Sequence, residues 1–108
     1  MKVFDLEPRI LATRNAIGQG LGKYFHKSIL FGSYAKGEQN EFSEIDILVL
    51  INGSKETLDG FRPFFWAVEE SFFLSENTVL QLIPVLSSYF DSEKNLFFRT
   101  INREGIEL

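Results

Sequence analysis

Two carboxylates at the start of an apolar segment have the clearest potential for chemistry in this sequence. Glu44 and Asp46 stand two positions apart, and Asp46 opens the nearly continuous apolar run Asp46–Ile51 (DILVLI). Residues two apart on a strand point to the same face, so the two carboxylates should converge. Like charges held close together repel each other unless a cation lies between them. The pair therefore predicts a metal site with carboxylate ligands, which suits Mg²⁺ or Mn²⁺.

A glycine turn that precedes the acidic pair has the features of a phosphate-binding element. Gly32 and Ser33 follow directly on the apolar run Ser28–Phe31, and Gly37 closes the element. Gly32 allows a sharp bend and leaves room for a phosphate. Ser33 offers a hydroxyl and a backbone N–H, and Lys36 offers a cation. The turn is therefore a candidate nucleotide-binding site, although Lys36 is equally consistent with an exposed loop lysine.

These two segments together resemble a known family. Gly32–Gly37 (GSYAKG), followed by Ser43–Asp46 (SEID), is similar to the GSxAxG…SDxD signature of the DNA polymerase beta-like nucleotidyltransferases, above all their minimal single-domain members. The resemblance implies the nucleotidyltransferase fold and a two-metal phosphoryl transfer. It also implies that Gly32 and Ser33 hold the phosphates of a nucleoside triphosphate. Glu44 and Asp46 would then be the catalytic residues that hold Mg²⁺ or Mn²⁺.

The sequence departs from the family signature at two places. Glu44 stands where the family has Asp, and the extra methylene moves the carboxylate by about 1–1.5 Å. In addition, the family has a third carboxylate on a later strand, but the predicted strand Thr78–Val85 contains no acid. The third carboxylate would align near Leu80 or Gln81, and an amide cannot act as a base. The departures favour triphosphate binding over efficient catalysis.

The hydrophobic pattern predicts an α+β fold, a small mixed β-sheet flanked by helices in the order α-β-β-α-β-α. Pro84 should mark the end of the third strand or an edge of the sheet. Gly105 should stop the last helix, with Ile106 packed back onto its final turn. The predicted elements are a helix from Asp5 or Leu6 to before Tyr24, strands at Ser28–Phe31 and Asp46–Ile51, a helix at Phe61–Leu74, a strand at Thr78–Val85, and a helix from Asp91 or Ser92 to Arg103.

Length and composition narrow the class of protein. The 108 residues fit a single domain, 1–108, with no cysteine and one histidine, so thiolate and histidine-rich metal sites are excluded. A net charge of −4 argues against an extended nucleic-acid surface, because such binding depends on clustered Lys and Arg. No apolar run approaches the roughly 20 residues of a membrane span, and no signal peptide is visible. A cytoplasmic protein is the expectation.

The aromatic residues of the predicted helix at Phe61–Leu74 divide into two groups. Phe61, Phe65 and Phe72 share one stripe, which is typical of core packing. Trp66 and Phe73 lie about 120–140° from Phe61 around the helix. Large aromatic side chains on that side indicate either a partner surface or a core that extends further around the helix.

The leading functional hypothesis is an enzyme that transfers a nucleoside monophosphate from a nucleoside triphosphate to an acceptor. The resemblance suggests that the acceptor belongs to a small all-helical HEPN-type partner, for which the chain would be the antitoxin. A second hypothesis is a catalytically degenerate protein that acts as a binding antitoxin or regulator. A third is a homo-oligomeric nucleotide sensor. The Gly-Ser turn favours the first hypothesis, whereas the missing third carboxylate favours the second.

Overall fold

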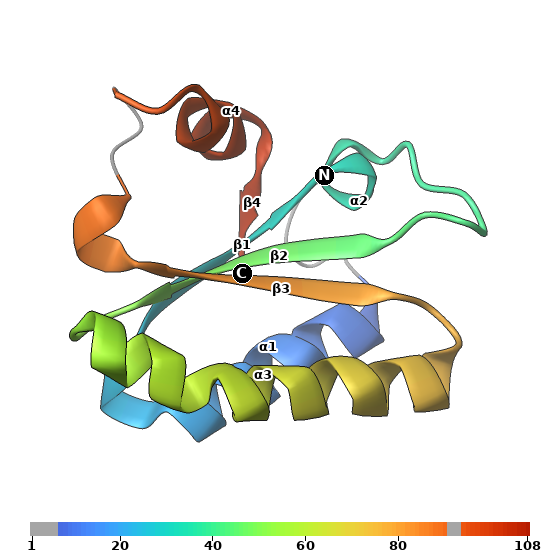
Figure 1. Ribbon diagram of the computed structural model, residues 1–108. Helices are drawn as coiled ribbons and strands as arrows, with labels where there is room; N and C mark the ends of the chain where they lie inside the picture. Colours follow the sequence, from blue (N-terminus) through green and yellow to red (C-terminus); the bar gives the residue numbers. More distant parts are fainter. Residues whose placement is uncertain (1–6, 91–93) are drawn as a thin grey trace.

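A four-stranded mixed sheet forms the centre of the fold (Figure 1), and the computed structural model describes residues 7–90 and 94–108. The spatial order is β3-β2-β1-β4. Strand β1 (Phe25–Phe31) is antiparallel to both β2 (Ile45–Ile51) and β4 (Ile106–Glu107), whereas β2 is parallel to β3 (Leu80–Leu86). The sheet is therefore mixed, as the sequence predicts.

Helices cover both faces of this sheet. Helices α1 (Pro8–Leu21) and α3 (Lys55–Glu76) lie against one face, and α4 (Leu96–Glu104) lies against the other (Figure 1). A short helix, α2 (Ser33–Lys36), follows directly after β1. Short 3₁₀ turns at 22–24 and 87–89 complete the described elements. Helix α2 is a single turn and strand β4 has only two residues. Because both are so short, the predicted order α-β-β-α-β-α does not contain them.

The apolar run of β2 is buried on both faces, which explains its lack of alternation. Ile45 and Ile47 belong to the main core between the sheet and helices α1 and α3. Leu48 and Leu50 point the other way and pack with Ile101 of α4 in a smaller core. Strand β2 is thereby packed on both faces of the sheet, which fixes the position of its first residues.

Helix α3 begins six residues earlier than the predicted Phe61. Its N-terminus is a capping box in which the Ser54 side chain accepts from Thr57 N and the Thr57 side chain accepts from Ser54 N. Leu58 is buried and anchors the first turns in the core. Pro63 lies inside the helix. The cap and Leu58 stabilise two turns whose Gly60 and Pro63 disfavour a helix locally.

The C-terminal segment partly follows the prediction. Asp91 and Ser92, predicted as caps, lie outside the described residues, and so do Asp5 and Leu6 at the start of the chain. The N-cap of α4 is Asn95, whose side-chain oxygen accepts from Phe98 N at 3.2 Å. Gly105 ends α4 as predicted. The expectation that Ile106 packs back onto the final turn of α4 is wrong, because Ile106 pairs with Leu30 of β1, extends the sheet as β4 and packs against the main core.

Candidate functional site

The antiparallel pairing of β1 and β2 brings the Gly-Ser turn next to the acidic pair. Phe31, the last residue of β1, is paired with Asp46 near the start of β2, and Gly32 follows immediately. The φ angle of Gly32 is 76°, which L side chains rarely adopt. A Cβ atom on Gly32 would lie 2.8 Å from Asp46 Oδ2. The carboxylate of Asp46 thus lies directly against the bend of the turn, whose backbone conformation favours glycine.

Asp46 interacts electrostatically with Glu44, which directly precedes β2. Burial raises the pKa of the half-buried Asp46 carboxyl, and the negative charge of the exposed Glu44 raises it further. Both effects disfavour two ionised carboxylates at this position. A divalent cation would reverse this disadvantage, and oxygen donors are the ligands that Mg²⁺ and Mn²⁺ prefer. The pair therefore fits a hard metal ion.

The register of β2 and β3 shows whether Leu80 or Gln81 occupies the position at which the family has its third carboxylate. Asp46 is paired with Gln81, and Ile45 is paired with Leu80. Paired residues of neighbouring strands have side chains on the same face. Leu80 is buried in the main core, so Gln81 is the residue on the Asp46 face. Within 7–90 and 94–108, no three His, Cys, Asp or Glu side chains are grouped closely enough to hold a metal ion.

The other candidate residues of the turn lie in and after α2. Ser33 is its first residue and is half-buried, and Gly37 ends it in the left-handed region at φ 70°. Lys36 forms an ion pair with Glu104 at the end of α4, with 3.3 Å between Nζ and Oε2. The hydrogen bond and the charge of Lys36 lower the pKa of Glu104. The cation of Lys36 is thus directed to α4 rather than to the acidic pair.

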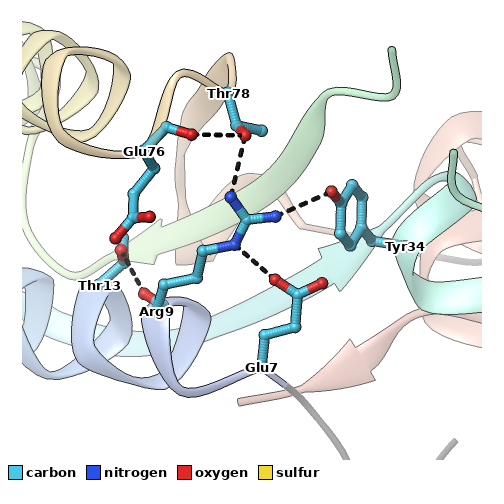
Figure 2. Close-up of polar contacts among 6 residues, drawn as sticks. All are labelled: Glu7, Arg9, Thr13, Tyr34, Glu76 and Thr78. Atoms are coloured by element: carbon cyan, nitrogen blue, oxygen red, sulfur yellow. Dashed lines mark hydrogen bonds and ion pairs between the residues drawn. The ribbon is translucent and has the colours of Figure 1, made fainter. Parts of the chain in front are cut away.

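Sequence reasoning missed Arg9, which braces the turn from the side of α1 (Figure 2). Its Nη2 donates to the hydroxyl of Tyr34 at 3.1 Å, and its Nη1 donates to Thr78 Oγ1 at 2.9 Å. Its Nε pairs with the carboxylate of Glu7. Tyr34 directly follows Ser33, and Thr78 lies just before β3. A single planar guanidinium therefore ties the turn to the strand that carries Gln81.

No local pattern could have revealed this contact, because Arg9 is 25 residues from Tyr34 and 69 from Thr78. Tyr34 is buried in the structure, in agreement with a structural role. The guanidinium also lies 5.7 Å from the centre of the Phe72 ring. Phe72 belongs to the core stripe predicted for α3, so the brace rests on the main core.

Trp66 and Phe73 are outside the core. Their exposed fractions are 63% and 48%, whereas Phe65 and Phe72 are buried. The predicted core stripe of α3 is confirmed. The alternative in which the core extends around the helix as far as Trp66 and Phe73 is wrong.

The comparisons with known proteins agree with this architecture. A family model described as "Nucleotidyltransferase domain" matches residues 21–104, and the chain therefore belongs to this family. No curated protein matches the chain. Among the residues that the structure describes, no helix is long and apolar enough to cross a membrane.

Solved structures of toxin–antitoxin proteins share the fold. A mutant of the toxin–antitoxin MntA–HpeT is 17% identical with a TM-score of 0.56, and the match covers 92% of this chain and 68% of that chain. A toxin–antitoxin with AMP-PNP is 18% identical with a TM-score of 0.54, over 87% of this chain and 70% of that chain. At these identities the likeness concerns the fold, and it confirms the predicted α+β nucleotidyltransferase architecture.

Proposed function

We propose that this nucleotidyltransferase domain binds a nucleoside triphosphate with Mg²⁺ or Mn²⁺ and transfers the nucleoside monophosphate to an acceptor hydroxyl. The observation that carries the proposal is the contact between Gly32 and Asp46. The two halves of the family signature come from separate strand ends, and they meet at Gly32, whose positive φ angle L side chains rarely adopt. An ordinary turn near solvated acids would not require this arrangement.

Each residue of the site has a defined part in the proposal. Gly32 and Ser33 hold the phosphates, Gly37 ends the turn, and Glu44 and Asp46 hold the metal ion. When bound, Mg²⁺ neutralises the triphosphate and stabilises the departing pyrophosphate. Lys36 contacts the triphosphate only after it has left Glu104.

The transfer itself exchanges one phosphorus–oxygen bond for another. The acceptor oxygen attacks the α-phosphorus, and the bond from that phosphorus to the bridging oxygen breaks. Pyrophosphate leaves with the electron pair. The acceptor proton passes to water, because Gln81 cannot accept it.

A second function, binding without effective transfer, is favoured by Gln81. The family has a carboxylate at the position that Gln81 occupies beside Asp46, and a neutral amide neither anchors a second metal ion nor acts as a base. A degenerate binding antitoxin or regulator would bind triphosphate equally well. The two functions therefore differ in the rate of transfer.

The acceptor in this proposal is a small helical protein of the HEPN class in the cytoplasm, and the chain is its antitoxin. Support comes from the family resemblance and from the toxin–antitoxin proteins that share the fold. An association of the chain with its own copies is the alternative.

Calorimetry with ATP tests the binding step. Wild-type protein should bind ATP more tightly with Mg²⁺ than without it, and Asp46→Asn should lose the metal dependence. Asp59→Asn is the matched control, because Asp59 pairs with Arg62 on α3 and carries a similar exposed charge. Equal binding with and without Mg²⁺ by the wild-type protein would rule out a working metal site.

A further inference from the structure

A groove runs beside the outer edge of β3, next to the candidate site. It has a volume of about 610 Å³ and lies between the second half of α3 and the start of β3. Its lining includes Glu44 and Gln81, which belong to the candidate site. We call it the edge groove, and it is lined by Glu44, Glu69, Glu70, Phe73, Val79, Leu80 and Gln81.

The lining of the edge groove combines exposed apolar surface with negative charge. Phe73 and Val79 are 48% and 44% exposed. Trp66 lies two helical turns before Phe73 on the same face of α3 and is 63% exposed, so the apolar strip extends beyond the groove. Three carboxylates line the groove, and no Lys or Arg is among its described lining residues. Such a surface attracts an apolar, positively charged partner and repels a polyanion.

The edge of β3 does not favour an added strand. The backbone N–H of Leu82 points away from β2 and donates to Glu69 Oε2 at 2.8 Å. Pro84 lies two residues further on the same side and has no N–H. The two central positions of this edge thus offer no free N–H donor to a new strand. This edge favours an occupant that binds through its side chains, as an amphipathic helix does.

We infer that the edge groove is the docking surface for a basic amphipathic helix of a protein partner. The apolar face of this helix covers Phe73, Val79 and Trp66, and its Lys or Arg side chains pair with Glu69 and Glu70. A segment seated there reaches the site at Gln81, where an acceptor hydroxyl would be delivered. Only this last role rests on the proposed function, because the docking needs no nucleotide.

Trp66 is the only tryptophan in the sequence and reports on docking directly. The probe is a synthetic amphipathic helix of Leu and Lys, titrated into the full chain without nucleotide or metal. Its binding should shift the emission of Trp66 to the blue and saturate. Phe73→Ser should weaken binding about tenfold, as expected for loss of a buried aromatic contact. Glu70→Gln should also weaken it.

Matched variants separate docking from a general effect. Leu74→Ser removes a neighbouring side chain that is 75% exposed but is not part of the groove, and Glu56→Gln removes a charge from the opposite end of α3. Both should bind the Leu–Lys helix like the wild type. A Leu–Glu helix of the same length should not bind. Thermal unfolding of each variant confirms that the fold is intact.

Several results would overturn the docking surface. One is that the Leu–Glu helix binds as tightly as the Leu–Lys helix. Another is that Phe73→Ser and Leu74→Ser lose affinity for the Leu–Lys helix to the same extent. A third is tight binding of a single-stranded oligonucleotide. Self-association that Phe73→Ser abolishes would assign the groove to a second copy of the chain. ATP binding with Mg²⁺, measured separately, should be unchanged by Phe73→Ser. If wild-type protein fails to bind ATP but binds the Leu–Lys helix, the proposed function fails while the docking surface remains.

Discussion

At the scale of single residues, Gly32 links the stability of the fold to the candidate site. An Ala at this position would need an unfavourable positive φ and would push against Asp46 Oδ2. We predict that Gly32→Ala lowers the free energy of unfolding by about 1–3 kcal/mol, because φ 76° and ψ −156° lie in a region that is almost exclusive to glycine, and that it abolishes ATP binding. Chemical denaturation and calorimetry measure the two effects.

Gly60→Ala is the control for this substitution. Gly60 lies inside α3, and no atom is within 4 Å of the position of its Cβ. This variant should be more stable than the wild type by about 0.5–1 kcal/mol and should bind ATP normally. If Gly32→Ala binds ATP like Gly60→Ala, the Gly-Ser turn is not a phosphate-binding element.

Asp46 should show a conflict between stability and function. Its pKa is raised by burial and by Glu44, so its charge destabilises the metal-free fold above that pKa, and the cost disappears as the pH falls through it. We predict that Asp46→Asn has a higher melting temperature than the wild type at neutral pH in EDTA. Added Mg²⁺ should stabilise the wild type and leave Asp46→Asn unchanged.

The difference between the two proteins in EDTA should shrink at acidic pH, when Asp46 is protonated. A lower melting temperature of Asp46→Asn throughout would mean that the carboxylate makes stabilising contacts that outweigh its burial and the repulsion from Glu44.

At the scale of elements, the brace made by Arg9 holds α2 and the start of β3 in one arrangement. Tyr34→Phe removes only the hydroxyl that accepts from Arg9. One such hydrogen bond contributes about 0.5–1.5 kcal/mol to stability, so the free energy of unfolding should fall by no more than that amount. ATP binding should weaken severalfold, because the turn that contains Ser33 is less well fixed.

Arg9→Lys extends this prediction. An ammonium group cannot replace the planar fork that spans Tyr34 and Thr78, so both stability and ATP affinity should fall. Arg62→Lys is the control, because Arg62 pairs with Asp59 of the same helix and both side chains are exposed. An unchanged ATP affinity in both Tyr34→Phe and Arg9→Lys would show that the brace serves the fold alone.

The elements also show what local sequence can predict. The run in β2 and the core stripe of α3 were identified correctly, because burial on a strand or a helix leaves a periodic pattern. The first two turns of α3 were missed, because they depend on Ser54 and on the burial of Leu58 while Gly60 and Pro63 disfavour a helix. Strand β4 was missed, because its two residues gain their partners only from the distant β1.

At the scale of the whole molecule, the candidate site and the edge groove are products of topology. The family signature, which combines the Gly-Ser turn and the acidic pair, lies within the fifteen residues from Gly32 to Asp46, so it can be identified from the sequence. The edge groove combines the loop before β2, the second half of α3 and the start of β3. Its composition could not be predicted from spacing, because the parallel pairing of β2 with β3 determines which side chains meet. The same pairing places Gln81, rather than Leu80, beside Asp46.

Gln81 separates the two proposed functions, and the register makes the test specific. A carboxylate at this position would lie beside Asp46 on the exposed face, where it could accept the acceptor proton and hold a second metal ion. We predict that wild-type protein binds ATP but transfers nucleotide slowly, and that Gln81→Asp raises the rate by about 10²–10⁴-fold. The assay is transfer of label from radiolabelled ATP to the purified helical partner.

Two variants serve as controls in this assay. Gln81→Asn keeps an amide and should remain slow. Leu80→Asp carries the same acid one residue away, but its side chain points into the main core, so it should lose several kcal/mol of stability and gain no activity. Fast transfer by the wild-type protein that is lost in Asp46→Asn would contradict the prediction. A base other than residue 81 would then have to accept the proton of the acceptor hydroxyl, and β3 would have no part in that proton transfer.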